Sequence, residues 1–215
     1  MRKATLLGTI ILSTYTVFGQ SKANEIPLFK YLQENFDSTV VCNSTNAWNS
    51  EPHYQIISKN NKGLAFFTYY NPFTFFSARA YPKELAEKFV MLSINYRFSK
   101  PDTNRYFLPG IVYYQYQDSL WYSIKKNDLW HLNDDKEDGD GCKTKRCMIS
   151  DAEEYNFYLI TRKEIKELYF YAPDFYESCC PGREGRFKIL QIIQSFNKSF
   201  NPHLQNIPVA TVSSQ

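Results

Sequence analysis

Five cysteines carry the most definite chemistry in this chain of 215 residues: Cys42, Cys142, Cys147, Cys179 and Cys180. A cysteine can form a disulfide, ligate a soft metal or act as a nucleophile. The spacing of Cys142 and Cys147 within a polar segment would allow a small disulfide ring, and Cys42 could reach either Cys179 or Cys180. The odd count leaves at least one thiol unpaired or bonded to another chain. The pairing itself does not follow from the spacing.

The alternative to disulfide formation is that these cysteines bind zinc, with His131 as a nearby imidazole ligand. However, Cys142 and Cys147 are widely spaced for a zinc-binding pair, and adjacent cysteines such as Cys179 and Cys180 chelate poorly. Oxidation is also the usual outcome for the cysteines of an exported chain. We therefore expect disulfides, with no metal and no cofactor.

A run of acidic residues at 134–140 has the oxygen ligands that calcium prefers. It departs from the helix-loop-helix calcium pattern, because Lys136 stands at a ligand position and no Glu follows at the twelfth position. Residues 133–146 are therefore predicted to be a solvated, mobile loop. Further along, Arg183 and Arg186 begin a predicted helix, whose free N–H groups could hold an anion, although this signal is weak.

Nucleophilic catalysis requires a Ser, Cys or Thr held against a base. The three histidines are His53, His131 and His203, and the chain has neither a Gly-x-Ser-x-Gly elbow nor a His-Glu-x-x-His motif. An exposed pair of Cys42 and His53 stays open. A hydrolase that uses two carboxylates from distant strands would leave no local motif, so an extracytoplasmic hydrolase with dispersed carboxylates is kept as the alternative function.

The aromatic content is high, with 17 Tyr, 17 Phe and 3 Trp. Short runs at 111–116, 120–124 and 129–132 are separated by turn-forming pairs, which predicts an antiparallel meander. Alternation along such strands would place part of the aromatic set on an exposed sheet face, and such a face can bind a glycan or a protein. The candidate binding residues are Tyr113, Tyr114, Tyr116, Trp121, Tyr122 and Trp130.

The first residues have the pattern of a secretory signal peptide. Arg2 and Lys3 precede an uncharged apolar run over residues 4–18, which is shorter than the ~20 residues that span a bilayer. We interpret residues 1–20 as a signal peptide, with cleavage after Gly19 or, as second choice, Ala23. The protein is then expected to be exported, to the periplasm or beyond, without stable insertion in a membrane.

The charge of the chain is nearly balanced. It has 25 basic and 22 acidic residues, and the loss of Arg2 and Lys3 would leave an excess of a single basic residue. Because nucleic-acid binders present a clustered basic face, this balance argues against a nucleic-acid partner.

Apolar periodicity predicts the elements that must position these side chains. The predicted elements are a helix at 26–36, a strand at 39–42, a hairpin at 54–58 and 64–70, a helix at 82–89, a strand at 91–98, a second hairpin at 155–161 and 167–171, and an amphipathic helix at 186–200. This order indicates an α+β fold with a largely antiparallel sheet of meander and hairpins. A β-barrel with a terminal helix is the alternative.

These observations lead to one hypothesis for the whole chain. A single α+β domain at 21–201 follows the signal peptide at 1–20, and residues 202–215 form a loosely held tail. The preferred function is a non-enzymatic binding domain that uses aromatic residues of a sheet face to bind a protein or a glycan. A structural or inhibitor protein with one large apolar patch is a third possibility.

Overall fold

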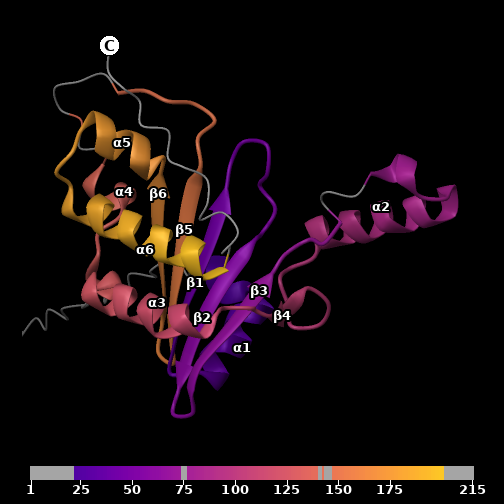
Figure 1. The fold of residues 1–215 in the computed structure, drawn as a ribbon, viewed down its shortest axis with the longest axis horizontal. Coiled ribbons are helices and arrows are strands. Elements are labelled where there is room, and N and C mark those ends of the chain that lie inside the picture. The colour runs from indigo at the N-terminus through magenta and orange to yellow at the C-terminus, as the bar shows by residue number, and fades with distance from the viewer. Residues whose placement is uncertain (1–21, 74–76, 140–141, 143–146, 201–215) are drawn as a thin grey trace, which may run out of the picture.

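The structure, a computed structural model, describes residues 22–73, 77–139, 142 and 147–200. The predicted signal peptide and the predicted C-terminal tail lie outside these residues. At the centre is a six-stranded antiparallel sheet with the order β4-β3-β2-β1-β5-β6 (Figure 1). Its strands are β1 (Ser38–Thr45), β2 (Tyr54–Asn60), β3 (Gly63–Tyr69), β4 (Phe107–Pro109), β5 (Glu154–Thr161) and β6 (Ile165–Tyr171). The α+β class is confirmed, whereas the barrel alternative is wrong because the sheet stays open between β4 and β6.

The strand order follows from two hairpins placed on either side of β1. The hairpin of β2 and β3 turns at Gly63, whose φ of +132° suits glycine, and β5 and β6 form the second hairpin. Both hairpins confirm the sequence prediction. Strand β1 pairs antiparallel with β2 and with β5, and its apolar residues are buried on both faces of the sheet.

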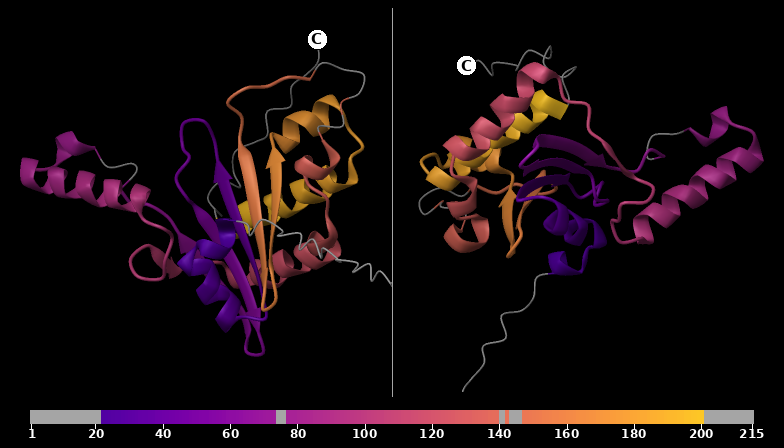
Figure 2. Two further views of the ribbon diagram at one scale, coloured as in Figure 1. Left: turned by 180° about the vertical axis from the view of Figure 1, so that it is seen from behind. Right: turned by 90° about the horizontal axis from the view of Figure 1, so that it is seen from below.

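Helices cover the two faces of this sheet. Figure 2 shows α3 (Tyr114–Lys126) and α6 (Glu184–Phe200) on one face and α1 (Pro27–Asn35) on the other. On the α6 face, the rings of Phe157 and Phe196 lie 6.0 Å apart, while on the α1 face Phe29 packs on Tyr158 at 4.7 Å. The predicted amphipathic helices at both ends are confirmed, because each buries its apolar stripe against the sheet.

Two predicted strand regions are helical instead. The predicted meander is α3 followed by the 3-10 turn η3 (Leu129–His131). Leu120 and Ile124 are four residues apart and both fully buried, so the helical period holds the core contacts there. The predicted strand at 91–98 belongs to one continuous helix, α2 (Lys83–Phe98), since no Gly or Pro interrupts it.

Helix α2 projects away from the sheet (Figures 1 and 2). Only Tyr96 of this helix is buried, whereas Met91 and Phe98 are 55% and 82% exposed. The remaining short elements are η1 (Lys22–Glu25), η2 (Ala78–Ala80), α4 (Asp135–Asp138) and α5 (Pro173–Cys179). No helix in the described residues has both the length and the apolar character needed to cross a membrane.

Candidate functional site

The structure divides the aromatic residues that were predicted to form a sheet face. Tyr113 precedes α3, Trp130 lies in η3 and the other four lie on α3, because the predicted meander is helical. Trp121 is buried in the core and Trp130 packs against it at 6.1 Å between ring centroids. Tyr114 is 86% exposed and Tyr122 is 63% exposed. An aromatic sheet face formed by these residues is therefore wrong as a prediction.

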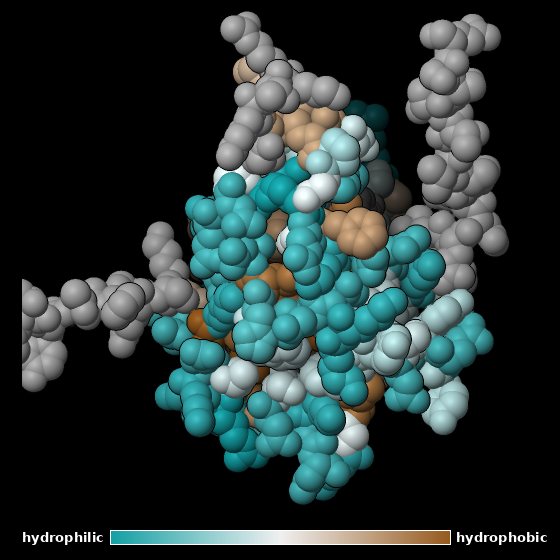
Figure 3. Space-filling model, turned by 90° about the vertical axis from the view of Figure 1, so that its left-hand side faces the viewer, coloured by the Kyte–Doolittle hydropathy of each residue, from teal (hydrophilic) through white to brown (hydrophobic). Residues whose placement is uncertain are grey.

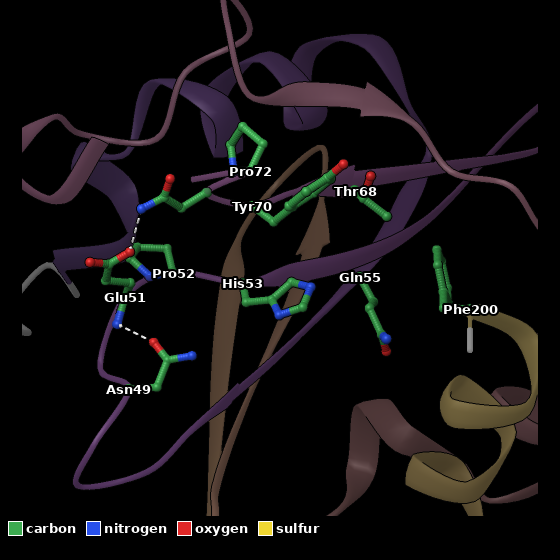
Figure 4. A pocket seen from close by; sticks show the side chains of 10 residues that line it. Asn49, Glu51, Pro52, His53, Gln55, Thr68, Tyr70, Pro72 and Phe200 are labelled. Carbon is green, nitrogen blue, oxygen red and sulfur yellow. Dashed lines mark hydrogen bonds between the residues drawn. The ribbon is translucent and has the colours of Figure 1, made fainter. Parts of the chain in front are cut away.

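A cavity of about 420 Å³ lies instead at the ends of β2 and β3, on the side where α6 ends (Figure 4). We refer to it as the β2–β3 cavity. Ring faces, amides and hydroxyls supply much of its wall, and the residues that matter most below are His53, Gln55, Thr68, Tyr70, Asn71 and Phe200. In Figure 4 the side chains of β2 and β3 stand between a loop on one side and Phe200 on the other.

Strand alternation explains why these side chains meet. Gln55 and Thr68 are cross-strand partners in the β2–β3 register. His53 and Tyr70 extend the same face by two positions along their chains, since side chains alternate between faces. Their ring centroids are 6.0 Å apart. The intervening Tyr54 points to the opposite face, where it is buried in the α1-side core.

Phe200, the last residue of α6, forms the far wall. It can approach the sheet because the segment below it carries Gly110. A Cβ atom on Gly110 would lie 3.0 Å from Phe200 Cε1 and 3.1 Å from the backbone of Phe66, which is closer than side chains normally pack. The position of this wall therefore depends on a residue without a side chain.

The loop wall of the cavity is held by α2. The Glu51 carboxylate pairs with Arg97 at 2.9 Å and also accepts a hydrogen bond from Asn71 Nδ2 at 2.8 Å. The same Asn71 amide donates to Ser93 Oγ at 3.0 Å. Both oxygens of Glu51 are thus engaged within the protein, so the carboxylate orients the wall of the cavity and its charge is compensated.

Tyr96 of α2 provides the second support, because its hydroxyl donates a hydrogen bond to the carbonyl of Pro52. Its ring stacks on Tyr69 at 5.4 Å and meets Tyr106 edge-on at 4.8 Å. Burial in this ring cluster raises the pKa of Tyr96 and raises that of Tyr69 to about 12. These phenols therefore stay neutral at physiological pH and support the loop wall from the α1-side core.

The cavity also has little net charge. His53 is exposed at the rim, but the surrounding protein partly desolvates its ring and lowers its pKa from the ordinary 6.5, so its imidazole is neutral at pH 7. Among the described residues that line the cavity, Glu51 is the single carboxylate, and it is already paired. A pair of carboxylates flanking a substrate, as a glycosidase requires, is not found in this wall.

A turn beside the cavity displays an indole ring. Asn46 Oδ1 accepts hydrogen bonds from the backbone N–H of Trp48 at 3.0 Å and of Asn49 at 2.8 Å. Trp48 itself is 90% exposed, while the next residue, Asn49, lines the cavity. An exposed tryptophan on an ordered turn offers a large apolar ring to a partner.

Cys42 lies on the sheet face that carries Gln55 and the β2–β3 cavity, but its thiol is not activated. It is a free thiol, buried in β1 opposite Gln55, and burial raises its pKa well above the ordinary value. The predicted disulfide of Cys42 with Cys179 or Cys180 is therefore wrong. The hypothesis of an activated Cys42–His53 pair also loses its basis, since an activated thiol needs a lowered pKa in an exposed position.

The other four cysteines form two disulfides, Cys142–Cys180 and Cys147–Cys179. The predicted ring between Cys142 and Cys147 is wrong. Instead, both bridges cross to the end of α5, with Cα–Cα distances of 5.5 and 6.1 Å. The bridges close loops with sequence separations of 38 and 32 residues, which restricts the unfolded chain. We call these four residues the cysteine cluster.

The acidic segment seals the β6 edge of the sheet. Asp134 Oδ2 accepts the N–H of Tyr169 at 2.8 Å, and Asp135 Oδ2 accepts the N–H of Tyr171 at 2.9 Å. The two carboxylates, which we call the acidic cap, thus replace the carbonyl groups of a neighbouring strand and block edge pairing. The predicted solvated loop is correct only in part for the described residues 133–139: Asn133 and residues 136–139 are exposed, but Asp134 is buried and Asp135–Asp138 form the short helix α4.

Two arginines at the start of α6 compensate this charge. Arg183 binds Asp135 at 2.7 Å and Asp138 at 3.1 Å, and the fully buried Arg186 lies 3.9 Å from Asp135. A hydrogen bond from Asn133, with Arg183 beside it, lowers the pKa of Asp138. The anion expected at this helix entry is therefore the protein's own carboxylate. The side of the molecule on which α4 and α5 lie has a mainly hydrophilic surface (Figure 3).

Comparisons with protein-family models, with curated proteins and with solved structures return no match to this chain. The site must therefore be interpreted from its own chemistry. Sequence reasoning named His53 but missed Trp48, Gln55, Thr68 and Tyr70. The signal for Gln55, Thr68 and Tyr70 was present in the predicted hairpin, since alternation places 53 and 55 on one face and 68 and 70 on the facing strand.

Proposed function

We propose that this chain is an exported, non-enzymatic binding domain that takes a neutral, hydroxyl-rich ligand of the glycan class in the β2–β3 cavity. The observation that carries the proposal is the cavity wall, which combines the rings of His53, Tyr70 and Phe200 with the polar groups of Gln55 and Thr68. Rings stack on the apolar faces of a sugar, while amides and hydroxyls match its hydroxyl groups.

The electrostatics favour the same ligand class. The Glu51 charge is compensated by Arg97, and partial desolvation of its ring lowers the pKa of His53 and favours its neutral form. An anionic ligand would lack a free cation in the described wall, and a cationic ligand would have to compete with Arg97. A neutral polyol carries neither cost, because its hydroxyl groups only exchange hydrogen bonds with water for hydrogen bonds with the wall.

Rigidity supports binding as well. The loop wall is fixed to α2 through Glu51, Asn71 and Tyr96, so little conformational entropy is lost when a ligand enters. The two disulfides support export, because such bonds persist in oxidising compartments. A signal peptide at residues 1–20 would supply the route.

The test is native gel electrophoresis of the mature chain in gels that contain a soluble neutral polysaccharide: β-glucan, xylan or galactomannan. We expect retardation by at least one of them, weakened by Tyr70→Ala and by Trp48→Ala. The matched control is Tyr114→Ala, which removes an exposed ring on α3, far along the chain from the cavity. Circular dichroism establishes that each variant is folded.

Each other result contradicts part of the proposal. Retardation that is lost in Tyr114→Ala and kept in Tyr70→Ala would move the site to the exposed aromatic residues of α3. The absence of retardation by all three polysaccharides would reject the glycan class and favour a protein partner. Release of reducing ends from a retained polysaccharide would replace the binding domain with the hydrolase alternative.

A further inference from the structure

The cysteine cluster brings two disulfides into direct contact. Cys147 Sγ lies 3.1 Å from Cys180 Sγ, although the two atoms belong to different bridges. The sulfur atoms of Cys142, Cys147 and Cys180 all lie within 4.8 Å of one another. A thiolate released at one bridge would therefore already touch the sulfur atom that it must attack.

From this geometry we propose that the cysteine cluster is a thiol–disulfide exchange site, in which two electrons from an external dithiol pass from the Cys142–Cys180 bridge to Cys179. This role is separate from ligand binding in the β2–β3 cavity. The acceptor of the electrons is a disulfide, and the donor class is a dithiol such as those of exported oxidoreductases.

The first step opens the bridge that is more accessible. Cys142 and Cys180 are partly exposed, whereas Cys147 is buried. A thiolate of the dithiol attacks Cys142 Sγ, the Cys142–Cys180 bond breaks, and Cys180 leaves as a thiolate. The second thiol of the reagent then displaces Cys142, so the reagent closes its own disulfide and is oxidised by two electrons.

The second step is internal. The Cys180 thiolate attacks Cys147 Sγ, a Cys147–Cys180 bond forms, and the Cys147–Cys179 bond breaks. The electron pair leaves on Cys179, which takes a proton from water. The net change is one oxidised dithiol and one protein with thiols at Cys142 and Cys179 and a single new bridge.

The surroundings favour a thiolate at Cys180. The guanidinium group of Arg186 is fully buried and donates to the carbonyl oxygen of Cys180 at 3.4 Å. A fixed cation next to a cysteine stabilises its anionic form relative to the thiol. The same arginine lies 3.9 Å from Asp135, which ties its position to the acidic cap.

The test is limited reduction of the folded mature chain with one equivalent of dithiothreitol, followed by acid quenching, alkylation and peptide mapping. We expect alkyl groups on Cys142 and Cys179 and a peptide pair joined by Cys147–Cys180. Alkyl groups on Cys142 and Cys180 with Cys147–Cys179 intact would refute the exchange. So would simultaneous loss of both bridges, or a Cys142–Cys147 bridge.

A single substitution tests the internal step without any reductant. In Cys142→Ala, the unpaired Cys180 is expected to exchange with the second bridge, so that native alkylation divides between Cys179 and Cys180. Alkylation confined to Cys180 would show that no exchange occurs. Cys42 serves as the internal control, since its buried thiol should react only after denaturation.

Discussion

At the β6 edge of the sheet, backbone N–H groups are taken up by the carboxylates of Asp134 and Asp135, whereas the β4 edge ends after three residues at Pro109. Arg183 and the buried Arg186 support the first edge through Asp135. Tyrosine rings and the hydroxyl of Tyr96 support the second, where α2 joins the body. The comparison teaches that the two ends of one sheet can be supported differently, by buried charge at one end and by neutral packing at the other.

The two kinds of support should differ strongly in their sensitivity to mutation. Removing one partner from a buried ion network lowers the unfolding free energy strongly, because an uncompensated charge stays buried. Removing a single hydroxyl hydrogen bond from neutral packing costs only the net contribution of that bond to the unfolding free energy. The predictions below test this difference, beginning with the largest expected effect.

Removal of the Asp135 carboxylate should have the largest effect. Asp135→Ala leaves the buried Arg186 and the nearly buried Arg183 without their shared partner, and a loss of about 3–5 kcal/mol in unfolding free energy is expected. Urea denaturation measures it. The control is Asp37→Ala, which removes an exposed pair with Arg162 and should cost less than about 1 kcal/mol. Equal losses in the two variants would contradict a charge-supported edge.

At the β4 end of the sheet, Tyr96→Phe removes one hydroxyl and keeps the ring. We expect a loss of about 1 kcal/mol, the usual net value of one hydrogen bond, because the carbonyl of Pro52 loses its donor. Thermal or urea denaturation measures this loss, with Tyr114→Phe as the exposed control. A loss as large as that of Asp135→Ala would remove the contrast between the two edges.

A weaker effect is expected from the protonation of His53. Burial lowers its pKa below 6.5, so the neutral form is present above that pH and the proton binds only as the pH falls further. A glycan that covers the ring would exclude more water and disfavour the charged imidazolium. Retardation by the polysaccharide should therefore be constant from pH 8 to about 6.5 and weaken below it. His53→Gln should abolish this dependence, and a pH profile unchanged by that variant would assign the titration to another group.

The smallest effect is expected on the projecting part of α2. Lys83→Ala removes an exposed pair with Glu87 at 3.9 Å, and the change in unfolding free energy should stay within about 0.5 kcal/mol. The measurement is urea denaturation at low and high protein concentration. A loss above about 1 kcal/mol that depends on concentration would mean that another copy covers this helix.

Much of the fold could be predicted from local patterns. The two hairpins, the strand at β1 and the helices α1 and α6 are correct. Each helix buries a regular apolar stripe on one side, and β1 is a short apolar run that is buried on both faces. The strand prediction for 111–132 was wrong because half-buried tyrosine and tryptophan residues, which favour strands, also fit on a helix. Leu120 and Ile124 carried the helical period, but aromatic alternation around them suggested strands.

The candidate site was predicted less well than the fold. His53 could be singled out as a titratable residue, but its neighbour Tyr70 belongs to another strand, and Phe200 comes from the far end of the chain. Trp48 lies among turn-forming Asn and Ser residues that have no apolar periodicity. No local pattern reports which loop a distant helix will hold against a sheet.

The sequence by itself determined the local order of this protein: which segments alternate, which carry a helical stripe, and which residues have thiol or carboxylate chemistry. Only the tertiary structure decided how those groups are used. It paired Cys142 with Cys180, turned Asp134 and Asp135 from a solvated run into an acidic cap, and left Cys42 alone in the core. The reason is physical: periodicity acts over a few bonds along the chain, whereas disulfides, buried ion pairs and cavities depend on which distant surfaces are pressed together when apolar area is buried.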